Sequence, residues 1–139
     1  FAALHYWWPK MFGILYNFRR AYIAATLATV GFMFHYVPMF IAGLMGMPRR
    51  TNDFLPQFAQ ANGLAAVGGL LLYAGIMLMF INLLLSFRTR VPASANPWGG
   101  CTLEWIVPSP PPLHNFVHKP TIPEYPYDFS EVLKGSPRP

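Results

Sequence analysis

Residues 63–87 read GLAAVGGLLLYAGIMLMFINLLLSF, and none of these 25 side chains carries a formal charge. A helix needs about 20 apolar residues to cross the hydrocarbon core of a bilayer. A second uncharged stretch, residues 21–48, would span ~42 Å as a helix at ~1.5 Å per residue, and only His35 and Pro38 are unusual in it. Membrane helices tolerate proline when neighbouring groups satisfy the freed carbonyl. The sequence therefore predicts transmembrane helices over 21–47 and 63–87.

The composition of the whole chain also indicates a membrane protein. Of its 139 residues, 11% are charged, 54% are hydrophobic and 17% are aromatic, whereas a soluble domain has roughly 25% charged residues. A single cysteine, Cys101, excludes an internal disulfide framework and metal sites held by several thiolates. The net charge of +5 comes from cations that flank the apolar spans. Because they form no cluster on one face, we expect no nucleic-acid partner.

The positions of the cations predict the topology. Five of them lie close to the spans on their inner flanks: Lys10, Arg19 and Arg20 before the first, and Arg88 and Arg90 directly after the second. The loop 48–62 between the spans carries two, Arg49 and Arg50, and also Asp53. By the positive-inside rule, both chain ends lie on the cytoplasmic or matrix side and the loop lies on the outer side. Residues 1–20 are then an inner-side loop segment.

Small and polar residues in the spans predict further helices around them. Ala65 and Gly69 are four residues apart, so they share a face on which another helix can approach closely. Two helices alone cannot bury this face together with the polar side chains of His35 and Asn82. We therefore expect the chain to be part of a larger bundle.

Residues 88–139 form a tail rich in proline, with the run Pro-Ser-Pro-Pro-Pro at 108–112. Such a segment favours extended structure over helix or sheet. It could dock on the aromatic groove of a recognition module or lie along its own complex. The density of aromatic residues, with Trp98 and Trp105 among them, favours the second alternative.

No arrangement of side chains indicates a catalytic nucleophile, a paired-carboxylate site or a phosphate-binding loop. The four histidines are interpreted as structural. Arg49 and Arg50 are the most informative residues, because they lie on the side of the membrane that the positive-inside rule disfavours. Either they anchor the helix end and are balanced by Asp53, or they bind a carboxylate or phosphate through bidentate hydrogen bonds.

Several motifs together resemble a known family. Residues 43–50, Gly-Leu-Met-Gly-Met-Pro-Arg-Arg, closely resemble the segment after the eleventh helix of subunit I of the haem–copper oxidases, the family that includes cytochrome c oxidase. The segment His-Tyr-Trp-Trp-Pro-Lys-Met-Phe-Gly at 5–13 is similar to the loop between the tenth and eleventh helices of that family. Asp53, Asn62 and residues 74–79 are similar to the region of the twelfth helix. Residues 96–99 and 102–112 resemble the tail of bacterial members, so the resemblance covers residues 1 to about 117.

The resemblance implies an all-α membrane protein: the last two transmembrane helices of a twelve-helix bundle, followed by a Pro-rich extended tail. It implies two haems of a-type and copper in the assembled complex, with the metal ligands on earlier helices outside this chain. Phe-His-Tyr-Val at 34–37 looks like the His-x-His-Tyr-Val ligand motif of the tenth helix, but it has Met33 in place of the first histidine and lies after the 5–13 loop. At position 51, where the family often has tyrosine, this chain has threonine.

The resemblance also assigns the candidate site residues. It implies that Arg49 and Arg50 bind haem propionates and that His35, Tyr36 and Met79 pack against haem. The first functional hypothesis is that the chain is the C-terminal portion of the catalytic subunit of a terminal oxidase, split or recorded as a piece because it begins at Phe1 without an initiator methionine. As a whole, that enzyme passes electrons from cytochrome c to O2 and pumps protons, and this chain alone is not expected to be active.

The partners implied are the remainder of subunit I with the haem ligands, other oxidase subunits, cytochrome c and membrane lipid. The membrane is the bacterial cytoplasmic membrane or the mitochondrial inner membrane. The second hypothesis is a two-helix accessory or assembly subunit that has a proline-rich recognition tail and does not contact a cofactor.

Overall fold

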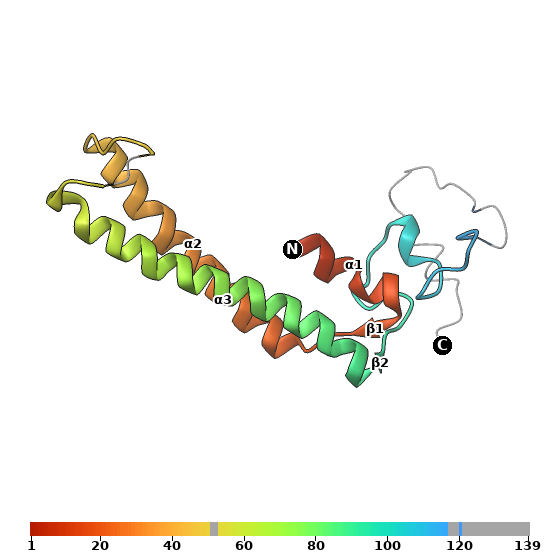
Figure 1. Cartoon of the computed structure of the whole chain (residues 1–139). Coiled ribbons are helices and arrows are strands. Elements are labelled where there is room, and N and C mark those ends of the chain that lie inside the picture. The colour runs from red at the N-terminus through yellow and green to blue at the C-terminus, as the bar shows by residue number, and fades with distance from the viewer. Residues whose placement is uncertain (51–52, 117–119, 121–139) are drawn as a thin grey trace. The chain divides into compact units, whose positions relative to one another are not determined.

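The structure is a computed structural model that describes residues 1–50, 53–116 and 120 (Figure 1). The elements are α1 (Ala2–Phe12), β1 (Ile14–Leu15), α2 (Phe18–Leu44), α3 (Ala59–Thr89) and β2 (Val91–Pro92), with single 3-10 turns at Pro56–Phe58 and Leu103–Trp105. The chain divides into two compact units. We call Asn17–Leu84 the helix unit, and Phe1–Tyr16 together with Leu85–Pro139 the tail unit.

The two long helices begin earlier than the charge-free stretches suggest. The first span, predicted over 21–47, is α2 at Phe18–Leu44, and the second, predicted over 63–87, is α3 at Ala59–Thr89. The side chain of Asn17 accepts a hydrogen bond from the backbone N–H of Arg20 at 3.0 Å. This N-cap satisfies one of the free N–H groups at the helix start and moves the start before the two arginines.

Glycines set the distance between α2 and α3, which lie side by side in Figure 1. A Cβ atom placed on Gly31 or Gly68 would lie 2.3 Å from a backbone nitrogen of the facing helix, and one on Gly75 would lie 2.5 Å from such an atom. The contacts pair Gly31 with Leu72 and Gly68 with His35, so the two helices run antiparallel. The close approach that the small residues predict is thus made within this chain.

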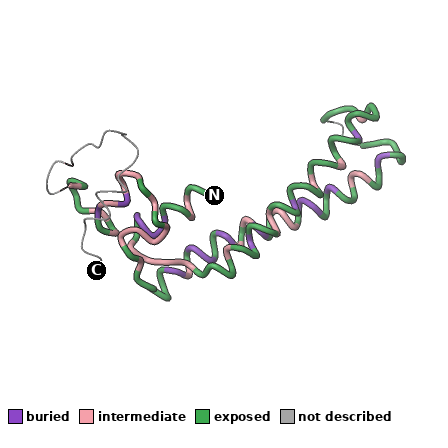
Figure 2. Tube along the Cα trace, turned by 180° about the vertical axis from the view of Figure 1, so that it is seen from behind, coloured by how far each residue is buried: buried purple, intermediate pink, exposed green. Residues whose placement is uncertain are grey.

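The outer faces of α2 and α3 are apolar and uncovered. In the most apolar windows of the two spans, 11% and 28% of the residues are buried inside the chain. In Figure 2 the buried residues of this pair lie where the two helices meet, and the remaining faces are exposed. Core helices of a soluble protein would be mostly buried, so these faces are suited to lipid or to other membrane helices.

The tail unit contains two features that the sequence analysis does not predict. The segment 1–20, predicted as a loop, contains the eleven-residue helix α1, which ends at Gly13 with a left-handed φ of 66°. β1 pairs with β2 as a short antiparallel sheet, with Ile14 opposite Pro92 and Leu15 opposite Val91. Spacing along the chain could not reveal this pairing, because its two strands are separated by the whole helix unit.

Candidate functional site

The C-terminal end of α2 is a Schellman motif, which directs the chain toward the two arginines. The N–H of Gly46 bonds to the carbonyl of Gly43 at 3.1 Å, and the N–H of Met47 bonds to that of Ala42 at 3.0 Å. Gly46 has a φ of +91°, a conformation that glycine adopts without a steric penalty. Pro48 follows directly, so the helix cannot continue.

A pocket of about 740 Å³ lies at this helix end. It is lined by the last turns of α2, including Tyr36 and Phe40, and by residues 47–50. Arg49 and Arg50 are both exposed, and Arg50 has a left-handed φ of 58°, which costs energy for a residue with a side chain. The pocket therefore combines an apolar wall with two cationic side chains at its edge.

The side chain of Asp53 makes a local hydrogen bond with the residue that follows it. Its Oδ1 atom accepts the backbone N–H of Phe54 at 2.8 Å. Within the described ranges 1–50 and 53–116, neither guanidinium forms an ion pair with a carboxylate.

The other predicted site residues are distributed along the helix pair. Tyr36 is 49% exposed and lines the pocket. His35 turns toward α3, where its Nδ1 atom lies 2.7 Å from the backbone oxygen of Ala65, to which it donates. Met79 is buried on α3, eleven residues or about 16 Å of helix beyond Gly68. The structure thus gathers Tyr36 with the arginine pair, places His35 in the contact between α2 and α3, and leaves Met79 buried farther along α3.

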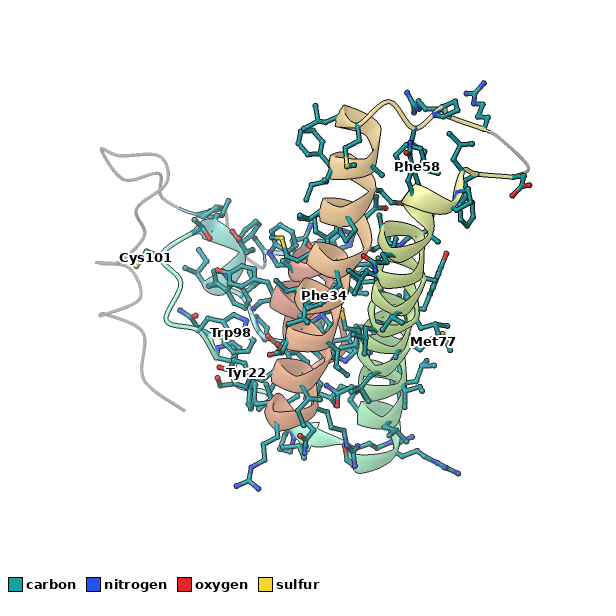
Figure 3. All side chains as sticks on the ribbon, turned by 90° about the vertical axis from the view of Figure 1, so that its left-hand side faces the viewer. Tyr22, Phe34, Phe58, Met77, Trp98 and Cys101 are labelled. Atoms are coloured by element: carbon teal, nitrogen blue, oxygen red, sulfur yellow. The ribbon has the colours of Figure 1, made fainter. Side chains whose placement is uncertain are left out.

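A contact that the sequence does not reveal connects α3 to Met47, two residues before the arginine pair. Asn62 Nδ2 donates to the backbone oxygen of Phe58 at 3.0 Å and lies 3.6 Å from the sulfur of Met47. Phe58 itself is 2% exposed and is labelled at this end of the helix pair in Figure 3. Asn62 is notable in the sequence only for its resemblance to the family, which does not indicate its partner.

In the tail unit, Lys10 is the central polar residue, although the sequence indicates only a topology-determining cation. It is 6% exposed, and its Nζ atom donates to the backbone oxygens of Ala95 at 2.8 Å and Val107 at 2.6 Å. The ammonium lies 5.2 Å from the ring centroid of Trp105, close enough for a cation–π interaction. Burial lowers the pKa of Lys10, and the nearby charge of Glu104 partly opposes this effect.

Tryptophans complete the attachment of the tail to α1. Trp105 is 1% exposed and its Nε1 donates to the Tyr6 hydroxyl at 3.1 Å, while Trp98 Nε1 donates to the Tyr6 backbone oxygen at 2.8 Å. Trp8 Nε1 donates to Ser86 Oγ at 2.9 Å. The tail is therefore packed against its own chain over residues 95–107. Position 51 and residues 117–119 and 121–139 lie outside the described residues.

The part of the chain that the structure describes contains no group of three His, Cys, Asp or Glu side chains placed to hold a metal ion. The features that remain are two uncovered apolar helices, a pocket with an arginine pair, and a packed tail. Together they define a section of a helical membrane bundle.

Comparison with known sequences gives the family of this section. Residues 1–71 match the family model described as Cytochrome C and Quinol oxidase polypeptide I. Cytochrome c oxidase subunit 1 of Thermostichus vulcanus is 36% identical over 129 residues, which cover 93% of this chain and 23% of that protein. The chain belongs to the subunit I family of haem–copper oxidases.

Other relatives carry different names within the same family. Cytochrome bo(3) ubiquinol oxidase subunit 1 of Buchnera aphidicola is 37% identical over 126 residues, covering 88% of this chain and 19% of that protein. Heme-copper oxidase subunit I+III of Aeropyrum pernix is 37% identical over 122 residues, covering 87% of this chain and 15% of that protein. The chain therefore spans less than a quarter of the length of these relatives.

Proposed function

We propose that the chain is the C-terminal portion of the catalytic subunit of a terminal oxidase that passes electrons from cytochrome c to O2 and pumps protons. The observation that carries the proposal is the exposed arginine pair at the edge of the pocket at the end of α2. Family membership supports it. The accessory-subunit alternative receives no such support, because the relatives are themselves subunit I proteins.

The residues at the pocket fit the propionate edge of haem. A propionate is a carboxylate, and a guanidinium offers it two parallel N–H donors. Arg49 and Arg50 would hold the propionates of two a-type haems, and Tyr36 would contribute apolar contact from α2. His35 and Met79 would support haem packing from the helix contact. When bound, the haems and copper supply the electron transfer and the reduction of O2, and their metal ligands would lie outside this chain.

The two cations would also tune the bound group electrostatically. An opposite charge close to a carboxylate favours its ionised form, so the arginines keep the propionates charged. The same positive charges stabilise an added electron on the haem and raise its reduction potential. The left-handed backbone of Arg50 is consistent with strain retained at a functional position.

The proposal includes partners and a location. The remainder of subunit I, with ten further helices, would cover the exposed faces of α2 and α3, and other oxidase subunits and lipid would complete the surroundings. Both chain ends would lie on the cytoplasmic or matrix side of a bacterial cytoplasmic membrane or a mitochondrial inner membrane. Arg49 and Arg50 would lie on the outer side, where they would hold the haem propionates.

The arginine pair is tested by Arg49→Gln and Arg50→Gln in the complete, assembled oxidase. We expect each variant to lower the reduction potential of a haem and to reduce turnover, with haem content measured in parallel. Arg→Lys at either position keeps the charge but loses the two-pronged donor, so its effect should be smaller without being absent. Unchanged potentials together with full turnover in both Gln variants would assign the pair to membrane anchoring.

The electron donor is tested separately, because the relatives include proteins named for cytochrome c and for ubiquinol. We expect the purified complex to consume O2 with reduced cytochrome c as donor. The matched measurement uses a reduced ubiquinol analogue with the same enzyme. If the complex turns over with the quinol and not with cytochrome c, the electron donor is a quinol, and the assignment as an oxidase still holds.

A further inference from the structure

We propose that Asn62 is a positioning residue for the arginine pair and that it acts through Met47. The proposal rests on the proposed function, in which Arg49 and Arg50 hold haem propionates. It adds Asn62, a residue of α3 whose hydrogen-bond partners are Met47 and Phe58. It assigns the contact between Asn62 and Met47 a role in setting the reduction potential of a haem.

The amide of Asn62 is itself held in place. Its Nδ2 atom donates to the backbone oxygen of Phe58, one turn earlier, at 3.0 Å. The same nitrogen lies 3.6 Å from the Met47 sulfur, and an amide has two N–H donors, so one can serve each partner. Phe58 is 2% exposed, so the turn that presents this carbonyl is packed in the helix unit. Asn62 therefore offers Met47 a fixed donor.

Met47 is the residue through which this position reaches the arginines. Its backbone N–H is bound to the carbonyl of Ala42 by the Schellman motif, and its side chain is bound by Asn62. Pro48 follows with a restricted φ, and Arg49 comes next. Met47 is thus held at two points, and only Pro48, with its restricted backbone, separates it from Arg49.

Without the side-chain anchor, the loop would depend on the Schellman turn alone. The central residue of that turn is Gly46, which has a φ of +91° and nothing within 4 Å of the position of a Cβ atom. The backbone dihedral angles of Gly46 can therefore change with little steric hindrance. A charged group acts on a cofactor most strongly when neighbouring contacts fix its position. Loss of the contact between Asn62 and Met47 should therefore let both guanidinium groups sample more positions. Their effect on the reduction potential of the haem should then be weaker.

The experiment uses Asn62→Leu and Met47→Leu in the assembled oxidase. Leucine replaces each side chain with an apolar one of similar size and removes the donor or the acceptor. We expect either variant to shift a haem reduction potential downward, by less than Arg50→Gln does. The double variant should shift it no further than the larger single shift, because both changes remove one contact. Asn62→Gln keeps an amide donor and should recover part of the shift.

Gln60→Leu is the matched control, since it makes the same kind of change at an exposed position of α3, and we expect no shift from it. In an Arg49→Gln/Arg50→Gln background, Asn62→Leu should have no further effect on the potential. If the arginine variants shift the potential and both Asn62→Leu and Met47→Leu leave it unchanged, the positioning role is overturned while the proposed function stands. If the arginine variants leave it unchanged, the propionate-binding role of the arginine pair itself fails. Should Asn62→Leu not assemble, Met47→Leu alone decides the outcome.

Discussion

Replacing Gly68 with alanine is expected to separate α2 from α3 and to destabilise the helix unit by about 3 kcal/mol, the upper part of the usual range for overpacking. The added Cβ would lie 2.3 Å from the backbone nitrogen of His35 and 2.4 Å from the backbone carbon of Phe34. Backbone atoms of a helix cannot move aside as the end of a flexible side chain can. The helices must therefore shift apart, and the hydrogen bond between His35 and the Ala65 carbonyl is strained at the same time.

Gly63→Ala is the matched control, because it makes the same substitution in the same helix at a position with nothing within 4 Å of the new atom. We expect Gly63→Ala to assemble normally and Gly68→Ala to give a low yield of haem-containing oxidase with a reduced midpoint of thermal unfolding. Equal yields and midpoints for the two variants would show that the helices tolerate a wider spacing than the structure indicates.

Replacing Lys10 with methionine is expected to release the segment 95–107 from α1. Methionine has a similar length but cannot donate hydrogen bonds, so the carbonyls of Ala95 and Val107 would lose the donor they share. An unsatisfied buried polar group costs about 1–3 kcal/mol, and the cation–π interaction with Trp105 is lost as well. A local loss of about 3 kcal/mol corresponds to exchange about a hundredfold faster in this segment.

Hydrogen exchange of the assembled protein measures this effect. The informative amides are those of Trp105 and Ile106, which bond to the carbonyls of Thr102 and Leu103. Arg88→Met removes an exposed cation from the end of α3 and serves as the control, with exchange expected to stay at the wild-type rate. If Lys10→Met exchanges no faster than Arg88→Met, the aromatic contacts hold the tail without the ammonium.

The two long helices could be predicted from the positions of uncharged residues along the chain. An uncharged run long enough to span a bilayer has few stable alternatives to a helix, because lipid offers no partner for backbone hydrogen bonds. The two spans were predictable for that reason, although the Asn17 cap and the Gly46 turn moved their ends by a few residues. The arginine pair was also predictable as a candidate site, since two cations on the disfavoured side of a membrane require an explanation.

The partners of the polar side chains were decided only by the tertiary structure. His35 bonds to a carbonyl 30 residues away, and Lys10 bonds to carbonyls 85 and 97 residues away. Any backbone carbonyl is chemically equivalent to these acceptors, so no residue pattern marks which one is used. The amino-acid sequence by itself determined where the two long apolar helices lie and where the arginine pair follows the first of them, because apolar length and charge follow from side-chain type. Packing determined what holds those cations in place, because it depends on which backbone segments meet.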